Sequence, residues 1–508
     1  MEKIASWLLA LFLSLYFSTL TAQTLSAKVL DAVTQEPIAY ATVQLKKKGV
    51  ITNEEGRFNL LIETDFTPTD SLFISYMGYE TLGKPIREFT DAVIYLRPQP
   101  IELRPVIVSN KNFTADEIMD LVKKNIATNY GKEGSKRRFF FRDSHHQALQ
   151  KMDYTFVKST IDELNIPFLD QVLHSLPKSS SYYTEILADL YEHPTEKDHK
   201  IEVIRASELY DKNKELDMNA LEEKFNAIIK ANVKPNSYFK VKSGLFGTKI
   251  KGEDFDELYK PEKDSLDAQM LEKELEAQKK KEVERKTNFA KYRKKTVARM
   301  LQNQFYLKDA KVNLIQKTRK YEFTLADFTY FGADAVYILD FTPKGSADYR
   351  GRIYVNADDF AIIRLDYENI KPIKTFKLLG ISMNNYLSKG KMIYAKNDQA
   401  LYAIRYLEEE FGTHIGVKRP LKIIEVNNHV KGRNKQNELA LKLDMATTST
   451  NKHELIIFEH QPISTATYDA FAENNTVLPT YMPNYDPNFW ADYSIIEPNK
   501  AITEFTSE

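Results

Sequence analysis

The chain has nine histidines, the residue type best suited to acid–base and metal chemistry near neutral pH, and their spacing favours neither role. His453 and Glu454 are followed by His460, so the two histidines four residues apart that a helical zinc-protease motif needs are absent. His145 and His146 are neighbours, and on a strand their side chains would point to opposite faces. The histidine pattern therefore predicts no metal site.

Candidate carboxylates and nucleophiles are equally sparse. Asp340 and the pair Asp358-Asp359 stand out, but the pair falls in a predicted hairpin turn, where Asp is common for conformational reasons. The chain contains no Gly-x-Ser-x-Gly nucleophile elbow and no Walker phosphate loop. We therefore predict no catalytic, cofactor-binding or metal-binding residues, and no cofactor.

Composition excludes several classes of protein. The 508 residues carry 71 Lys and Arg against 71 Asp and Glu, and a net charge of zero argues against a nucleic-acid binder driven by a basic surface. The absence of cysteine excludes disulfide frameworks, thiolate zinc sites and cysteine nucleophiles. With 29 Tyr, 29 Phe and 2 Trp, disorder throughout is excluded as well. At roughly 150 residues per domain, about three domains are expected.

Residues 1–22 have the pattern of a secretory signal peptide. Lys3 supplies a positive start, residues 4–20 are mostly apolar, and a cleavage point follows Ala22, before Gln23. The alternative is an uncleaved membrane anchor, but about 17 apolar residues are at the lower limit for spanning a bilayer. We predict a mature N-terminus at Gln23. No cysteine follows the signal, so a lipoprotein is excluded.

Residues 23–97 alternate between short strand patterns and turn patterns. Turns are indicated around Asp31 and Pro37 and at residues 52–56, where residues with turn chemistry gather. The strand patterns occupy residues 25–30, 40–45, 57–62, 72–76 and 92–96. This alternation of strand and turn patterns, with no helical periodicity, predicts a small β-sandwich of about seven strands.

Three ordered motifs stand in this region: Asp31…Thr34…Glu36-Pro37-Ile38…Ala41-Thr42-Val43, Thr52-Asn53-Glu54-Glu55-Gly56-Arg57-Phe58 and Ser75-Tyr76-Met77-Gly78-Tyr79. Together they resemble the carboxypeptidase-regulatory-like domain, from residue 24 to about residue 109. The resemblance implies a transthyretin-like sandwich, common at the N-terminus of secreted envelope proteins of Gram-negative bacteria. It implies roles in folding support and protein contact, and no peptidase activity. It also implies export, to the periplasm or in association with the outer membrane.

A linker at residues 98–112, broken by three prolines, precedes a mixed α/β region at residues 113–303. Thr114 and Glu117 have the capping-box spacing of a helix start. Residues 261–299 are rich in charge, with a few apolar residues at helical spacing. They form either a projecting arm or coiled coil, or a solvated helix packed on one side, which charge runs favour.

In residues 304–470, apolar and polar residues alternate as in long antiparallel strands that have one buried face and one solvent-exposed face. The pattern Val336-Tyr337-Ile338…Gly351-Arg352-Ile353-Tyr354-Val355-Asn356 resembles the curved sheet of periplasmic lipoprotein-carrier-like folds, which implies an apolar concavity. An aromatic and proline-rich tail follows at residues 471–508. We expect it to dock on the body through Phe489 and Trp490.

The predicted fold class is multidomain, with an N-terminal all-β sandwich followed by an α+β body with a long-stranded antiparallel sheet. The predicted function is a non-enzymatic binding or adaptor role, in which the sandwich is a contact module and the concave sheet binds an apolar ligand or a protein. The alternatives are a periplasmic lipid or lipoprotein carrier, which requires an apolar cavity, and a secreted hydrolase, which requires convergent carboxylates or histidines. We expect an envelope protein or an apolar ligand as partner, no nucleic acid, and peripheral association with the outer membrane.

Overall fold

The structure is a computed structural model that describes residues 23–46, 48–62, 66–99, 113–131, 134–193, 199–244, 246–250, 268–474 and 476–507. The described chain divides into two compact units. The first contains residues 23–99 with two later segments, residues 329–334 and 486–501, and the second contains the rest. Ala22 and residues 100–112, most of the expected linker, lie outside the described residues, whereas Gln23 begins the first strand.

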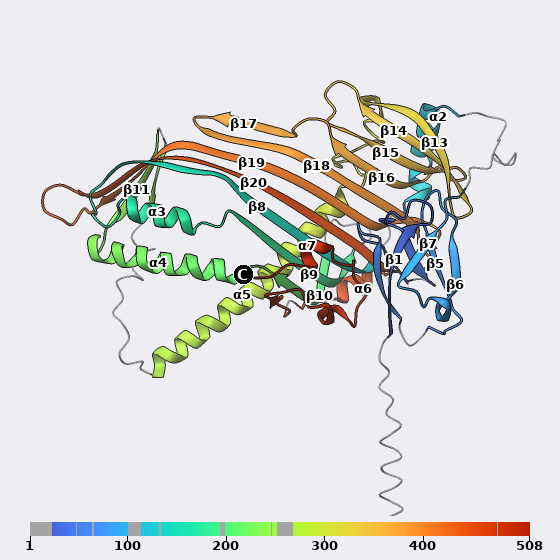
Figure 1. The fold of residues 1–508 in the computed structure, drawn as a ribbon, viewed down its shortest axis with the longest axis horizontal. Coiled ribbons are helices and arrows are strands. Elements are labelled where there is room, and N and C mark those ends of the chain that lie inside the picture. The colour runs from blue at the N-terminus through green and yellow to red at the C-terminus, as the bar shows by residue number, and fades with distance from the viewer. Residues whose placement is uncertain are drawn as a thin grey trace, which may run out of the picture. The chain divides into compact units, whose positions relative to one another are not determined.

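The first unit contains a two-sheet sandwich of seven short strands, as the sequence predicts (Figure 1). One sheet has the order β4-β1-β7 and the other the order β3-β2-β5-β6. Alternate residues such as Val29, Val43 and Ile74 are fully buried between the sheets. The strands are β1 (Gln23–Asp31), β2 (Thr42–Leu45), β3 (Lys48–Ile51), β4 (Arg57–Ile62), β5 (Ser71–Ser75), β6 (Leu82–Pro85) and β7 (Val93–Leu96), with a 3-10 turn η1 (Ile86–Glu88).

Two turn residues of the sandwich show why its motifs have these residue types. The Asp31 carboxylate accepts hydrogen bonds from the backbone N–H groups of Val33 and Thr34, and from the Tyr79 hydroxyl at 2.6 Å. Gly56 has a φ of 74°, and a Cβ there would lie 2.5 Å from the Val29 carbonyl oxygen. Only glycine satisfies both conditions.

The tail segment 486–501 belongs to the first unit and packs on the sandwich. Asn53 donates from Nδ2 to the carbonyl oxygens of Glu497 and Pro498, at 3.3 and 3.2 Å. Trp490 is 2% exposed, so the expectation that it anchors the tail is confirmed. The surface that receives the segment differs from the expected one: it is the sandwich and not the body, because Asn53 and the Leu61 backbone supply the hydrogen bonds.

The second unit is built on one 14-stranded sheet with the order β13-β14-β15-β16-β18-β19-β20-β8-β9-β10-β21, with β11, β12 and β17 off this path. From β14 to β10 the neighbouring strands pair antiparallel, and β10 pairs parallel with β21. The strands are β8 (Ser135–Ser159), β9 (Ser179–Glu192), β10 (His199–Leu209), β11 (Tyr238–Ser243), β12 (Phe246–Ile250), β13 (Tyr321–Phe331), β14 (Asp334–Pro343), β15 (Tyr349–Asn356), β16 (Ile362–Asn369), β17 (Lys374–Leu378), β18 (Ile381–Lys396), β19 (Tyr402–Val426), β20 (Lys435–Pro462) and β21 (Thr480–Met482).

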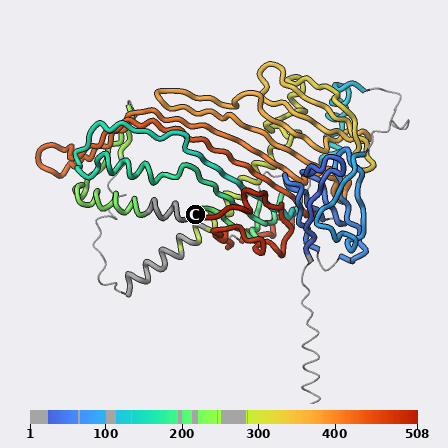
Figure 2. Tube along the Cα trace, viewed as in Figure 1, coloured from blue at the N-terminus to red at the C-terminus, as the bar shows by residue number. Residues whose placement is uncertain are grey.

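Three of these strands are unusually long and lie side by side: β8 has 25 residues, β19 has 25 and β20 has 28. Figure 2 shows the traces of these three strands running side by side through the second unit. The sandwich followed by an α+β body with a long-stranded antiparallel sheet confirms the predicted fold class.

The helices of the second unit include α2 (Ala115–Asn129), α3 (Ile166–Ser175), α4 (Lys212–Asn232) and α5 (Ala268–Gln302). The Thr114–Glu117 capping box is confirmed at the start of α2. The C-terminal part of α5 buries Ala290, Val297 and Met300, which favours the helix packed on one side over a free arm. Residues 261–267 of the expected helix lie outside the described residues.

The short helical elements are α6 (Thr465–Ala470), α7 (Lys500–Thr503) and the 3-10 turns η4 (Thr318–Lys320) and η5 (Pro487–Trp490). Within the described parts of the chain, no helix has the length and apolar character required to cross a membrane.

Candidate functional site

Strict alternation of side chains along the β19–β20 pair divides the sheet into two chemically different faces. The pairing runs without a bulge from Tyr406 opposite Ile456 to Ile424 opposite Glu438. Because successive strand residues point to opposite faces, every second residue of each strand lies on the same face over this length. The chemistry of each face can therefore be read from the register.

One face lies toward the helices. On β8, the Tyr154 hydroxyl donates to the Asp170 carboxylate of α3 at 2.7 Å. The Asp143 carboxylate of β8 lies 2.7 Å from the Arg293 guanidinium of α5. The long strands bend around this side, where α3, α4 and α5 lie (Figure 1). We call it the helix-facing side of the sheet.

Two adjacent rows of residues, all of them apolar except Thr447, cross the middle of the helix-facing side. Each row takes one residue from each of β17, β18, β19, β20 and β8, which are neighbours in the sheet. At about 4.8 Å between strands, a row is roughly 19 Å long. The rows, which we call the apolar strip, are Leu378–Ile381–Val417–Met445–Met152 and Phe376–Met383–Ile415–Thr447–Leu149.

Much of the apolar strip is open to solvent in the structure. Phe376 is 43% exposed, Leu378 is 54% and Ile415 is 41%. The other strip residues are partly buried, apart from Ile381, which is also exposed. Large apolar side chains gathered on one face and left in contact with water are typical of a binding surface.

The opposite face of the same strands is polar. Lys418, Asp444 and Asp153 form one row across β19, β20 and β8, and the Lys151 ammonium lies 2.7 Å from Asp444. A pocket of about 440 Å³ opens at this position, lined by Asp153, Tyr154, Thr155, Lys418, Arg419, Pro420, Lys442, Leu443 and Asp444. Its charged side chains of both signs suit water and not an apolar ligand.

Along one side, the apolar strip is bounded by the junction with α3 and α4. Burial and the hydrogen bond to Asp170 raise the pKa of Tyr154 to about 12, so the hydroxyl stays protonated. Arg419 donates from Nε to the Ser243 hydroxyl of β11 at 2.8 Å. Beyond this polar pair, an apolar cluster joins the strands to α3 and α4, with Phe168, Leu221, Ile229, Val233 and Phe239 among its buried members.

Farther along the strands on the other side of the strip, a charged cluster lies under α5. Asp143 accepts from Arg293 and lies 3.3 Å from His453 Nε2, while Arg299 lies 3.2 Å from His453 Nδ1. Burial alone would raise the pKa of Asp143, but His453 and Arg293 lower it. Paired charges therefore occupy the helix-facing side beyond Ser449 and Asn451 along β20.

A buried ion pair on the face away from α5 ties β8 to β9. Arg142 is 1% exposed and donates from Nε to the Glu185 carboxylate at 2.7 Å. Burial alone would lower the pKa of Arg142, but Glu185 and Glu454 raise it. Arg142 is opposite both Glu185 and Glu454 in the register, so these charges link the three strands β9, β8 and β20.

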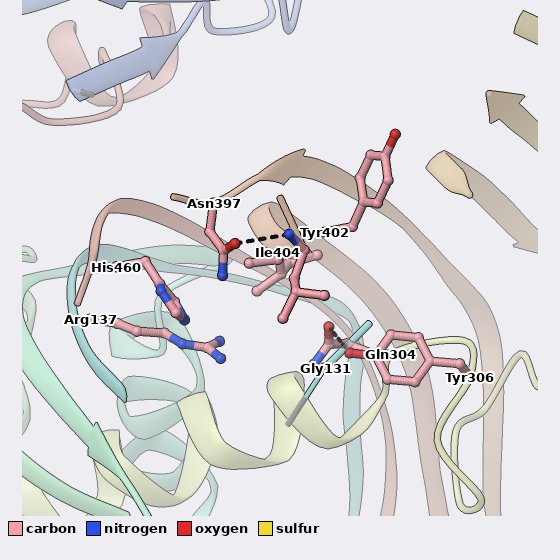
Figure 3. A pocket seen from close by; sticks show the side chains of 10 residues that line it. Gly131, Arg137, Gln304, Tyr306, Asn397, Tyr402, Ile404 and His460 are labelled. Carbon is pink, nitrogen blue, oxygen red and sulfur yellow. Dashed lines mark hydrogen bonds between the residues drawn. The ribbon is translucent and has the colours of Figure 1, made fainter. Parts of the chain in front are cut away.

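A small polar cavity of about 30 Å³, sufficient for a water molecule, lies beside Arg137 and His460. Figure 3 shows these two side chains next to each other, with Gln304 and Tyr306 across the cavity. Burial and the neighbouring Arg137 lower the pKa of His460 to about 4. Burial alone would raise the pKa of Glu192, but Arg137 at 2.7 Å and His199 lower it to about 2.

The carboxylates singled out in the sequence do not converge on one site. Asp340 pairs with Arg352 across β14 and β15 at 2.6 Å. Asp358 and Asp359 lie in the turn after β15, as predicted, and Asp359 accepts from the Tyr402 hydroxyl.

The histidines singled out in the sequence are also apart. His145 contacts Asn451 on β20 and His146 contacts Ser181 on β9, which fits their expected opposite faces. His453 and Glu454 are on β20 and not on a helix. Across the residues that the structure describes, no group of three His, Asp or Glu side chains is arranged to hold a metal ion.

The two-sheet architecture and the Asp31 and Gly56 turns of the first unit coincide with a known family. Residues 25–108 match the family model of the CarboxypepD_reg-like domain. These residues are a carboxypeptidase-regulatory-like domain. The match includes β2 to β7 entirely and most of β1, and none of the body.

No curated protein sequence matches the chain significantly. Among solved structures, a chain from "The complex structure of Pseudomonas aeruginosa MucA/MucB" aligns with 69% of this chain and 99% of its own length, at 6% sequence identity and a TM-score of 0.15. So low a TM-score carries no argument. The resemblance of the body to lipoprotein-carrier-like sheets is not confirmed.

Sequence reasoning named no residue of the apolar strip, although it expected a concave apolar sheet. The period-two pattern of residues 413–423 and 439–447 was the available signal, since Ile415, Val417, Leu421 and Ile423 alternate with polar residues or glycine. It could not show which strands stand next to each other, because β8 and β20 are about 300 residues apart in the chain.

Proposed function

We propose that this chain is a non-enzymatic binding protein of the bacterial envelope, and that its apolar strip binds a ligand with an acyl chain. The observation that carries the proposal is the exposure of aligned apolar residues, such as Ile415 and Phe376, on one face of a sheet whose other face is charged. A row of roughly 19 Å is comparable to one bilayer leaflet, about 15 Å of hydrocarbon. An acyl chain laid across the five strands would replace water along each row.

The polar groups beside the strip suit the polar end of such a ligand. Tyr154 and Arg419 lie along one side of the strip, two residues beyond Met152 and Val417 in their strands. A carrier role follows if the ligand is passed on to another protein, and it remains the alternative. A hydrolase is less favoured, because Asp340 is paired with Arg352 and Asp359 accepts from Tyr402.

The test is titration of the chain from Gln23 to Glu508 with a dansyl-labelled fatty acid, followed by fluorescence. Ile415→Gln places a polar amide in the middle of the strip, and we expect the affinity to fall about tenfold, which corresponds to ~1.4 kcal/mol. The matched control is His414→Gln, because His414 is the adjacent exposed residue and points to the opposite face. Equal affinities of both variants and the parent chain would refute the proposal.

The sandwich supports a second role, as a contact module for extended polypeptide. Asn53 and the Leu61 backbone already hold the chain's own residues 494–498. This observation supports an adaptor function of the carboxypeptidase-regulatory-like domain. Export rests on residues 1–22, and N-terminal sequencing of the protein from a bacterial envelope should start at Gln23.

A further inference from the structure

The segment at residues 370–381, which we call the β17 hairpin, exposes all of its large apolar side chains. It includes the edge strand β17, in which all five residues are exposed. Each of its six large apolar residues is at least 37% exposed, namely Ile370, Ile373, Phe376, Leu378, Leu379 and Ile381. Exposed apolar residues gathered in one segment, with Phe376, Leu378 and Ile381 on one face of it, mark a site of protein or membrane contact.

The tip of the β17 hairpin is strained in a way that its fold does not require. Leu378 pairs with Ile381, so Leu379 and Gly380 form a two-residue turn, with φ values of 49° and 79°. Gly380 is needed there, because a Cβ would lie 2.1 Å from the Lys418 carbonyl oxygen. Leu379 is not needed for the turn, since Asn or Gly adopts this conformation with less strain. An exposed leucine kept at a strained position points to a function.

The β17 hairpin is also basic. It contains Lys371, Lys374 and Lys377 and no acidic residue. Lys371 lies 3.2 Å from Asp348. Among the described residues, neither Lys374 nor Lys377 has a carboxylate within ion-pair distance, and both are exposed. Their charges are therefore available to an anionic surface.

We propose that the β17 hairpin docks the body on a lipid bilayer with anionic headgroups. Phe376, Leu378 and Leu379 enter the boundary between headgroups and acyl chains, and Lys374 and Lys377 contact the phosphates. Long lysine side chains reach the headgroup level while the apolar residues beside them are immersed. Each lysine near an anionic surface adds attraction that salt weakens.

The same observations disfavour a second copy of the chain as the occupant. Two β17 edges paired side by side would bring Lys374 and Lys377 close to the same lysines of the other copy, and like charges across a strand pair are destabilising. The proposal goes beyond ligand binding by the apolar strip, with which the hairpin shares Phe376, Leu378 and Ile381. Leu379 at the hairpin tip lies outside both rows of the strip, so a variant there tests docking separately.

The experiment is sedimentation of the chain from Gln23 to Glu508 with vesicles of phosphatidylglycerol and phosphatidylethanolamine, and with vesicles of phosphatidylcholine alone. Starting at Gln23 removes the apolar residues 4–20, which would bind vesicles by themselves. We expect binding to the anionic vesicles that weakens at least tenfold as the salt concentration rises from 50 to about 500 mM.

Leu379→Asn is the most informative variant, because Asn tolerates the positive φ and removes the apolar tip. We expect vesicle affinity to fall at least fivefold while the thermal midpoint is unchanged or higher. Lys374→Glu with Lys377→Glu should abolish the preference for anionic vesicles. The matched control is Lys317→Glu with Lys320→Glu, an exposed lysine pair elsewhere on the body that should bind like the parent chain.

Three outcomes would overturn the proposal. The first is that the parent chain stays in the supernatant with both kinds of vesicle. The second is that Leu379→Asn and the double lysine variant sediment as the parent chain does. The third is that size-exclusion chromatography shows a dimer that Leu379→Asn dissociates, with no vesicle binding, which would make a second copy the occupant. Dansyl fatty-acid affinity of Leu379→Asn should equal that of the parent chain, so that failure of docking and failure of ligand binding are distinguishable.

Discussion

Arg142 and Glu185 form an ion pair from which water is almost wholly excluded, since they are 1% and 0% exposed. Removing one partner leaves the other charge buried and uncompensated, which typically costs about 3–5 kcal/mol. We therefore expect Arg142→Met to lower the free energy of unfolding by this amount, and Arg142→Met with Glu185→Gln to restore most of it. Urea unfolding followed by circular dichroism measures both changes.

The matched control for this pair is on the surface of the same sheet. Arg350 and Glu368 lie 2.6 Å apart across β15 and β16 and are both exposed. Surface pairs contribute about 0–1 kcal/mol, so Arg350→Met should have little effect. An equal loss in Arg142→Met and Arg350→Met would contradict the assignment of the buried pair.

His460 and Glu192 make stability depend on acidity. The pKa of His460 falls to about 4 in the folded chain, below its usual 6.5, so the unfolded chain binds the proton first. Stability is therefore fully present above pH 6.5 and is lost as pH falls toward 4. The lowered pKa of Glu192, about 2, extends the loss below pH 4.5.

Replacing His460 isolates the first of these two losses. In His460→Gln the free energy of unfolding should change little between pH 7 and pH 5, whereas the parent chain should lose stability over the same range. The control His146→Gln, on an exposed strand residue, should follow the parent chain. Identical pH profiles of His460→Gln and the parent chain would show that the cavity beside Arg137 does not hold a neutral histidine.

The helix α2 has an end that the sequence specifies by itself. The Thr114 hydroxyl accepts from the Glu117 backbone N–H at 3.3 Å, and the Glu117 carboxylate accepts from the Thr114 backbone N–H at 2.8 Å. We expect Thr114→Ala to weaken the first turn by about 1 kcal/mol. Hydrogen exchange of the α2 amides should then be roughly fivefold faster near Glu117.

The control for this cap is Thr128→Ala, the same change at an exposed position near the other end of α2. Alanine has the higher helix propensity there, so exchange should be unchanged or slower. Faster exchange in Thr128→Ala than in Thr114→Ala would exclude the capping box as the stabilising feature.

The elements that depend on neighbouring residues could be predicted from the sequence, and those that depend on distant pairing could not. The cap of α2, the strand β4 and the turn with Asp358 and Asp359 follow from local patterns. By contrast, the patterns at residues 401–406 and 422–426 indicate two strands, and the structure has one strand of 25 residues. Gly412, Gly416 and Pro420 interrupt the pattern locally, but β18 and β20 on either side keep the strand continuous.

The apolar strip illustrates the same limit at the level of the site. Its ten residues come from five strands, and a row is fixed only when the register of every neighbouring pair is known. Two extra residues of β8, where the register shifts at Leu441 and at Thr447, place Met152 and Leu149 on the helix-facing side. Nothing in the sequence of β8 alone indicates these bulges.

At the scale of the whole molecule, two later segments of the chain belong to the unit that contains the N-terminal sandwich. Residues 329–334 and 486–501 belong to the same compact unit as the sandwich, although they are more than 200 residues away in sequence. The Gly78 backbone N–H donates to the Tyr330 carbonyl at 2.9 Å, and Ile495 and Ile496 are almost fully buried. The carboxypeptidase-regulatory-like domain is therefore completed by chain segments that its family match does not contain.

Asn53 is the residue that tests whether the tail segment is held by the sandwich. Its Oδ1 atom accepts from the backbone of Glu55 and Arg57, and its Nδ2 atom donates to Glu497 and Pro498. Asn53→Asp keeps the acceptor and replaces the donor by an anionic oxygen facing two carbonyls, at a cost of about 1–3 kcal/mol. Hydrogen exchange over residues 490–500 should accelerate roughly 10- to 100-fold, while Gln44→Glu, which adds the same charge to the exposed side of β2, should leave it unchanged. If both variants exchange at the parent rate, Trp490 and the two buried isoleucines suffice to hold the segment, and the Asn53 hydrogen bonds only accompany that packing.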